Sequence, residues 1–270
     1  MLRASHWRFC CSVVLTVGLL GPVSVVTADT VVVTPASMMA AGWKIATQQG
    51  VGSEGAAGTA VGEFENGYGN PPLGTGSFHL RVGYSDKDPL SKVYLGTNSF
   101  SGIRLDKITQ LKLWACPRWN DFKDAQPVTV ELAVDKSGNL RLFTFKPWGN
   151  APTGYYGRLS WREINLMAPR GAWQMTNTSS VDYKGDWTWL VGRYPGAQLV
   201  TPPTADWPAG TMSGTSLSIK IGAGKSGDDG HPWWWYESCG CNCYVDKLTV
   251  GYLNDGGQEV VTVYDFEPGS

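Results

Sequence analysis

The sequence predicts an all-β protein, an antiparallel β-sandwich of the jelly-roll type with long loops rich in Gly, Pro and Trp. Three observations predict this class. Apolar and polar residues alternate with a period of two in several short segments. Turn-forming residues separate those segments. No stretch of twelve or more residues keeps a helical apolar stripe free of Gly and Pro, which favours a sandwich of short strands.

Residues 1–28 have the pattern of a secretory signal peptide. Arg3 and Arg8 precede an almost uncharged apolar run, and Val26-Thr27-Ala28 has the small residues of a cleavage site. The run is short and broken by Gly and Pro, whereas a membrane-spanning helix needs about 20 apolar residues. We therefore expect cleavage after Ala28 and a secreted product, extracellular or periplasmic, with no membrane span.

Residues 29–270 are expected to form a single β-sandwich domain, because all-β units commonly reach about 200–250 residues. The chain has 22 Lys and Arg against 23 Asp and Glu, so it lacks the basic face that nucleic-acid binding requires. Aromatic residues make up 12% of the chain, which argues against wholesale disorder. We expect a monomer that does not bind nucleic acid.

The clearest strand signal lies at residues 128–135, where Val and Leu alternate with Thr, Glu, Ala and Asp. Turn-forming residues 135–139 follow, and residues 140–145 return as the second strand of a hairpin. Further strands are expected at residues 77–82, 92–95, 111–116, 216–221, 244–250 and 260–266. Residues 50–76 and 187–214 are expected to be long loops, which on a rigid sheet often carry binding sites.

Several short motifs follow one another along the chain: PPLGTGSFHL at 71–80, LKLW at 111–114, VTVELAVD at 128–135, Trp161, YVDKLTVG at 244–251 and YDFEP at 264–268. Their order resembles a group of secreted bacterial proteins, mostly uncharacterised, with a jelly-roll, concanavalin-A-like sandwich. The ending is similar to that of jelly-roll carbohydrate-binding modules, whose penultimate strand carries an Asp before an apolar pair. The resemblance spans about residues 60–268 and implies the fold more than the function. Residues 233–243 depart from that group.

Aromatic residues cluster at two places. In an extended chain, alternate residues share a face, so each cluster would present rings on one side. Flat indole rings stack on the CH faces of sugars, and their N–H groups donate to hydroxyls. The candidate ligand-binding residues are Trp187, Trp189, Trp233, Trp234, Trp235 and Tyr236. The alternative is that these residues belong to the core, because a large aromatic side chain buries about 150–250 Å².

Four cysteines follow the predicted cleavage site: Cys116, Cys239, Cys241 and Cys243. An even number in an exported chain predicts disulfides. Pairing across a single residue would strain the bond, so we expect Cys239–Cys243 and Cys116–Cys241. The alternative is a thiolate metal site, with His231 as a further ligand.

Two aspartates are candidate calcium ligands. Asp246 and Asp265 share the strand parity of neighbouring apolar residues, so each is expected to face the interior, where an unpaired charge is costly. A structural Ca²⁺ would offset that cost, since it prefers oxygen ligands. The alternative is a β-bulge that turns the side chain outward, or hydrogen bonds to loop amides.

The sequence favours a secreted, non-catalytic carbohydrate-binding module that uses Trp-lined loops to bind a polysaccharide or glycan. Glu63 and Glu65 would share a strand face, but no E-x-D-x-x-E or G-x-S-x-G sequence is present. A glycoside hydrolase or polysaccharide lyase on the same scaffold is the first alternative, and an extracellular structural or matrix protein is the second. A groove lined by two carboxylates, or by Tyr, Arg and His, would favour the enzyme.

Overall fold

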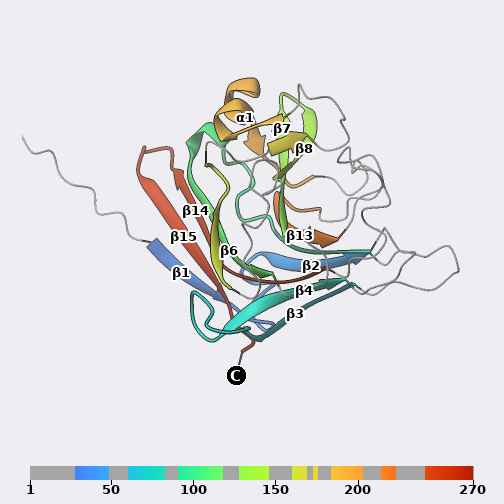
Figure 1. Cartoon of the computed structure of the whole chain (residues 1–270). Coiled ribbons are helices and arrows are strands. Elements are labelled where there is room, and N and C mark those ends of the chain that lie inside the picture. The colour runs from blue at the N-terminus through green and yellow to red at the C-terminus, as the bar shows by residue number, and fades with distance from the viewer. Residues whose placement is uncertain are drawn as a thin grey trace, which may run out of the picture.

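The computed structural model describes residues 28–48, 60–82, 91–117, 128–145, 160–168, 173–175, 184–202, 214–222 and 241–269. These residues form two β-sheets, one short helix α1 (Trp187–Arg193) and a 3-10 turn η1 (Leu105–Lys107) (Figure 1). The expectation of a mostly-β protein is therefore confirmed. Neither of the described helical segments is long and apolar enough to cross a membrane.

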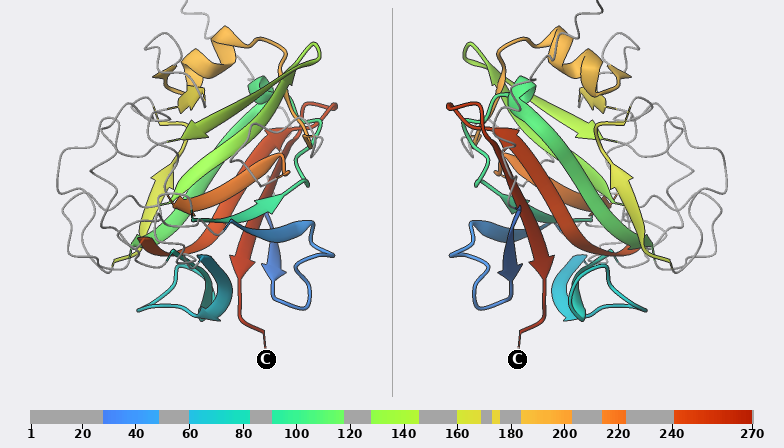
Figure 2. Two further views of the ribbon diagram at one scale, coloured as in Figure 1. Left: turned by 90° about the vertical axis from the view of Figure 1, so that its right-hand side faces the viewer. Right: turned by 90° about the vertical axis from the view of Figure 1, so that its left-hand side faces the viewer.

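The first sheet has seven strands and curls into a half-barrel (Figure 2). Its strands are β1 (Ala28–Val33), β3 (Ala60–Asn66), β4 (Gly76–Val82), β6 (Ile108–Pro117), β9 (Arg162–Asn165), β14 (Cys241–Leu253) and β15 (Glu259–Phe266). The main path runs β1-β15-β14-β4-β3, while β6 joins β14 to β9. Because β1 runs parallel to β15, this sheet is mixed, and the expectation of a purely antiparallel sandwich is wrong here.

The second sheet has eight strands, and all its pairings are antiparallel. They are β2 (Trp43–Gln48), β5 (Lys92–Thr97), β7 (Thr129–Lys136), β8 (Asn139–Phe145), β10 (Trp173–Met175), β11 (Lys184–Gly185), β12 (Gln198–Leu199) and β13 (Leu217–Gly222). The path is β11-β10-β8-β7-β13-β5-β2, with β12 beside β7. The predicted hairpin is confirmed as β7 and β8. Ser137 and Gly138 form its turn with φ of 55° and 82°, the left-handed values that a tight two-residue hairpin turn requires.

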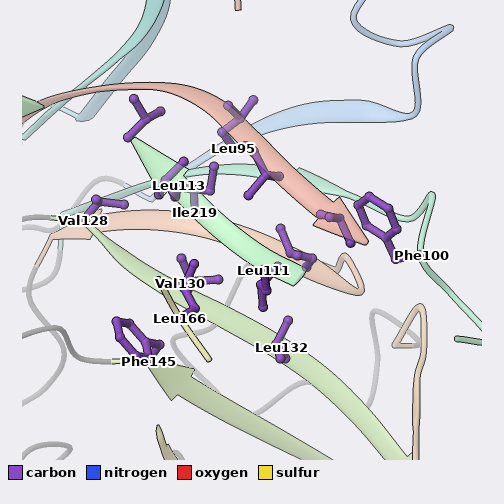
Figure 3. Close-up of a cluster of buried hydrophobic side chains, with 14 of the residues drawn as sticks. Leu95, Phe100, Leu111, Leu113, Val128, Val130, Leu132, Phe145, Leu166 and Ile219 are labelled. Carbon is purple, nitrogen blue, oxygen red and sulfur yellow. The ribbon is translucent and has the colours of Figure 1, made fainter. Parts of the chain in front are cut away.

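The two sheets face each other across one apolar core (Figure 3). Val130 and Leu132 of β7 meet Leu111 and Leu113 of β6 there, and each of these side chains is at most 2% exposed. The period-two alternation that predicted the strands is thus the alternation between core and outer face. Burying one such side chain stabilises the fold by about 1.5–3 kcal/mol.

Strand β14 is long enough to have two different neighbours along one edge. Its residues 241–245 pair with β4, and its residues 248–253 pair with β15. The other edge pairs with β6 from Cys243 to Tyr252, with a bulge between Asp246 and Thr249 and a second register shift between Gly251 and Tyr252. Lys247 takes a φ of 47° at this bulge, which reverses the side-chain alternation. The start of β4 and the end of β15 therefore meet beside Asp246.

Both segments expected to be long loops contain regular structure. The first holds β3, in which Gly62 lies where a Cβ would come within 2.8 Å of both Phe78 and Val93. Strand β3 can therefore pack closely only because this residue has no side chain. The second holds α1, whose N-cap Asp186 accepts a hydrogen bond from the Trp189 amide at 2.8 Å.

Candidate functional site

The helix α1 places the first two candidate tryptophans differently from the extended chain that we expected within this loop. Trp187 is 7% exposed, and its ring packs edge-on against Trp173 with the centroids 5.6 Å apart. Trp189 is half-buried against Gly185, where a side chain would collide with the indole. Residues two apart in a helix do not share a face. The expectation of a shared face is therefore wrong, and Trp187 is a core residue rather than a stacking platform.

The remaining aromatic candidates, Trp233, Trp234, Trp235 and Tyr236, lie outside the described residues. Their role in binding stays a prediction. The same holds for His231 and Cys239, which the thiolate alternative requires.

No disulfide joins the described cysteine side chains, Cys116 and Cys243, both of which are fully buried. Cys116 lies opposite Tyr244 on the neighbouring strand, whereas Cys243 lies opposite Pro117. One register step separates the two cysteines, so their side chains point to opposite faces of the sheet and cannot bond to each other. Burial raises the pKa of the Cys116 thiol to about 11, which disfavours the reactive thiolate. The side chain of Cys241 is outside the described part.

Asp246 occupies the junction between β4 and β15. It is completely buried, and its Oδ1 and Oδ2 atoms accept hydrogen bonds from the backbone N–H groups of Phe266 and Leu73, each at 3.1 Å. Burial raises the pKa of Asp246 to about 7, although these hydrogen bonds act in the opposite direction. The bulge and the loop amide match the alternative that the sequence left open for this residue.

Asp265 lies beside Glu267 at the same junction. The Oε1 atom of Glu267 accepts hydrogen bonds from the backbone N–H groups of Thr75 at 2.8 Å and Gly76 at 3.1 Å. Asp265 is 8% exposed, and burial, the charge of Glu267 and a hydrogen bond to it raise the pKa of Asp265 to about 6. Backbone donors already occupy both oxygens of Asp246, whereas Oδ1 of Asp265 has no hydrogen-bond partner in the described structure. Calcium binding by Asp246 and Asp265 stays a prediction.

The eight-stranded sheet carries a row of polar side chains on its outer face, away from the core. Four strands contribute one residue each, in direct register: Gln174, Thr144, Glu131 and Ser218. We call these four residues the polar row. None of them is more than 5% exposed. The outer face of a two-sheet sandwich is usually solvated, so a buried polar row there needs an explanation.

Glu131 forms an ion pair with Lys220, which lies on β13 two residues after Ser218. The ammonium of Lys220 also lies 5.9 Å from the centre of the Tyr94 ring. The second carboxylate oxygen, Oε2 of Glu131, and the hydroxyl of Ser218 are buried without a hydrogen-bond partner among the described residues. Burying an ion pair costs several kcal/mol of desolvation, and an unmet hydrogen-bonding group adds to that cost. Each of these unsatisfied buried groups therefore needs an explanation.

None of the candidate site residues predicted from the sequence belongs to this site. Glu131 and Lys220 lie on the polar faces of the strands predicted at 128–135 and 216–221, where charged side chains are ordinary. That the two residues meet depends on β13 lying next to β7, a pairing of segments about 80 residues apart that no local pattern specifies.

Comparison of the chain with protein-family models, with curated proteins and with solved structures found no match. Function is therefore inferred from the chemistry of the described residues.

Proposed function

We propose that the protein is a secreted, non-catalytic carbohydrate-binding protein built on a jelly-roll sandwich, and that sugar hydroxyls bind at the polar row. The observation that carries the proposal is the buried acceptor Oε2 of Glu131 beside the buried hydroxyl of Ser218, both without a partner in the described structure. Sugar hydroxyls donate and accept hydrogen bonds, so one ligand group satisfies both atoms. Trp233, Trp234, Trp235 and Tyr236 remain in the proposal as residues that stack on sugar rings.

The charge of the site favours a neutral ligand. Glu131 and Lys220 neutralise each other, so the polar row offers hydrogen bonds without a net charge. An acidic polysaccharide would need unpaired cations, whereas a neutral glycan needs only donors and acceptors. A chain with 17% charged residues and a net charge of −1 also lacks a strong field for an ionic ligand.

The same face supports binding better than cleavage. Hydrolysis of a glycosidic bond commonly uses two carboxyl groups about 5–9.5 Å apart. The next described carboxylate along the outer face of β7 is Asp135, four residues from Glu131 and so about 13 Å away at about 3.3 Å per residue. Its Oδ2 atom also accepts a hydrogen bond from Gly138 in the hairpin turn.

Affinity-gel electrophoresis tests the proposal. Soluble neutral glycans (xylan, mannan and β-1,3-glucan) are compared with alginate and pectin, and insoluble cellulose and chitin are tested by pull-down. We expect retardation by at least one neutral glycan, with loss of it in Ser218→Ala and Glu131→Gln. Gln198→Ala, an exposed change on β12, is the control.

Three outcomes are informative besides success. New reducing ends or unsaturated products would show that the protein cleaves the glycan rather than only binding it. If both polar-row variants are still retarded by the glycan, the glycan binds at a site other than the polar row. Absence of binding to every glycan, with indoles uniformly shielded from acrylamide quenching, would contradict the proposal and favour the matrix protein.

A further inference from the structure

A second polar cluster lies on the other sheet, on the outer face of β3, β4 and β14. Glu63 and Glu65 are two residues apart on β3 and share a face, and His79 lies directly opposite Glu63 on β4. One donor atom from each of these three side chains lies within 4.8 Å of the other two. We call Glu63, Glu65 and His79 the three-donor cluster.

The imidazole of His79 is held in one orientation. The residue is 4% exposed, and its ring stacks on Tyr244 with the centroids 4.3 Å apart and an angle of 16° between the planes. Tyr68 stacks in turn on Tyr244 at 6.1 Å. The Nε2 atom of His79 contacts the side-chain oxygen of Asn242, and its Nδ1 atom faces the two glutamates. The stack and the asparagine therefore fix which ring nitrogen points into the cluster.

The hydrogen bond at Nε2 determines what the other nitrogen can do. Because the side-chain oxygen of Asn242 can only accept, Nε2 donates to it, and Nδ1 is the ring nitrogen that faces the glutamates. Nδ1 contacts Oε1 of Glu65 and lies 3.9 Å from Oε1 of Glu63. Oε1 of Glu65 is buried and has no partner among the described residues other than this ring nitrogen. Two carboxylates and Nδ1 converge here, so a positive charge must lie among them, either a proton on Nδ1 or a bound cation.

We propose that the three-donor cluster is a binding site for a divalent transition-metal cation of the Zn²⁺ type. A metal that binds Nδ1 takes the place of any proton there, and the two carboxylates then supply a charge of −2, which a divalent cation balances. The imidazole ligand favours Zn²⁺ and its neighbours in the transition series over Ca²⁺ and Mg²⁺, which prefer oxygen ligands alone. Asn242 acts as the positioning residue, since histidine ligands of metals donate their second N–H to such an acceptor. Three protein ligands leave a fourth position for water or for a ligand group.

The proposal does not depend on glycan binding, because the cluster lies on the other sheet. Its test is a zinc titration of the purified full chain after dialysis against a chelator, followed by calorimetry. We expect one zinc site that Glu63→Gln and Glu65→Gln each weaken about tenfold or more. These substitutions keep the shape of each side chain and remove its charge. Glu163→Gln, which removes an exposed carboxylate of the same sheet, is the matched control and keeps the affinity of the unmodified protein.

Asn242 gives a second, independent measurement. Asn242→Leu is expected to weaken zinc binding by about 10–100-fold, whereas Asn242→Asp keeps the acceptor and restores the affinity. Circular dichroism in the presence of chelator shows whether each variant is folded. The Co²⁺-loaded protein should show ligand-field bands without an intense thiolate charge-transfer band, which distinguishes this site from one made by cysteines.

The proposal is overturned if the unmodified protein takes up no zinc, because a proton on Nδ1 then supplies the positive charge. It is also overturned if both glutamine variants bind zinc as the unmodified protein does, or if the cobalt spectrum shows thiolate ligation.

Discussion

The buried carboxyl of Asp246, at the β4–β15 junction, should make the free energy of unfolding fall as the pH rises. Asp246→Asn should remove this contribution. Folding raises the pKa of Asp246 from 3.8 to about 7, chiefly through burial. A carboxyl with a raised pKa keeps its proton longer in the folded chain. Its contribution to stability is therefore complete below about pH 4 and is lost as the pH rises through about 7. At about 1.4 kcal/mol per pKa unit, the loss is about 4 kcal/mol.

Asparagine at position 246 does not titrate, but it has one acceptor oxygen where aspartate has two. Either Leu73 or Phe266 then has a backbone N–H that faces an amide NH₂ group, at a cost of about 1–3 kcal/mol. At about pH 4, Asp246→Asn should be less stable than the unmodified protein by that amount. At about pH 8, the variant no longer bears the charging cost of about 4 kcal/mol, so the order of stability should reverse.

Urea unfolding at a series of pH values from about 4 to 8 measures the difference directly. Asp255→Asn, in the exposed turn between β14 and β15, is the matched control. Any change that it reproduces comes from removing one negative charge rather than from the junction. A difference between Asp246→Asn and the unmodified protein that stays constant across the whole range would refute the reasoning, because Asp246 would then not titrate in this window.

Three further changes test other parts of the structure, each by urea unfolding or thermal melting. Glu131→Gln should cost about 3–5 kcal/mol, because it leaves the Lys220 ammonium buried without its ion-pair partner, and adding Lys220→Met should recover much of that loss. Gly74→Ala should destabilise the fold by more than Gly69→Ala: both glycines have a positive φ, but only at position 74 would the new methyl overlap a neighbouring carboxylate, whereas position 69 is open. Leu113→Ala should cost about 2–5 kcal/mol, since Leu113 is fully buried in the core, and a smaller loss would mean that the two sheets can close the cavity.

The sequence predicts the central strands well because one physical effect decides them. Where a strand lies between core and outer face, its side chains must alternate, and the sequences of β7 and β13 show that alternation plainly. In β8 the apolar parity changes, because Leu142 lies on the face opposite to the core residues Phe143 and Phe145. Strand β3 escaped prediction because Gly62 and the neighbouring glycines resemble a loop. Gly62 approaches Phe78 and Val93 so closely that only a glycine fits there. This is a tertiary contact that no local sequence pattern reveals.

The junction beside Asp246 shows where sequence periodicity fails for a different reason. Counting by two from Leu248 places Asp246 on the core face. The left-handed conformation of Lys247 shifts the alternation by one residue, so Asp246 leaves that face while Leu248 stays in the core. The shift accompanies the change of neighbour from β4 to β15, which takes place beside this residue. A lysine with positive φ has no reliable sequence signature, so the sequence offers the bulge only as an alternative.

The two polar clusters differ in charge, and this difference predicts that their ligands bind independently. Glu131 is neutralised by Lys220, so the polar row has no electrostatic need for an ion. The three-donor cluster has two carboxylates beside one imidazole and no Lys or Arg partner among its members, so it attracts a cation and gains little from a sugar hydroxyl. Chelator should therefore remove zinc without changing glycan retardation, and Glu131→Gln should abolish retardation without changing zinc affinity. Loss of glycan binding on chelation, in a protein that stays folded, would mean instead that the open coordination position of the metal holds the sugar.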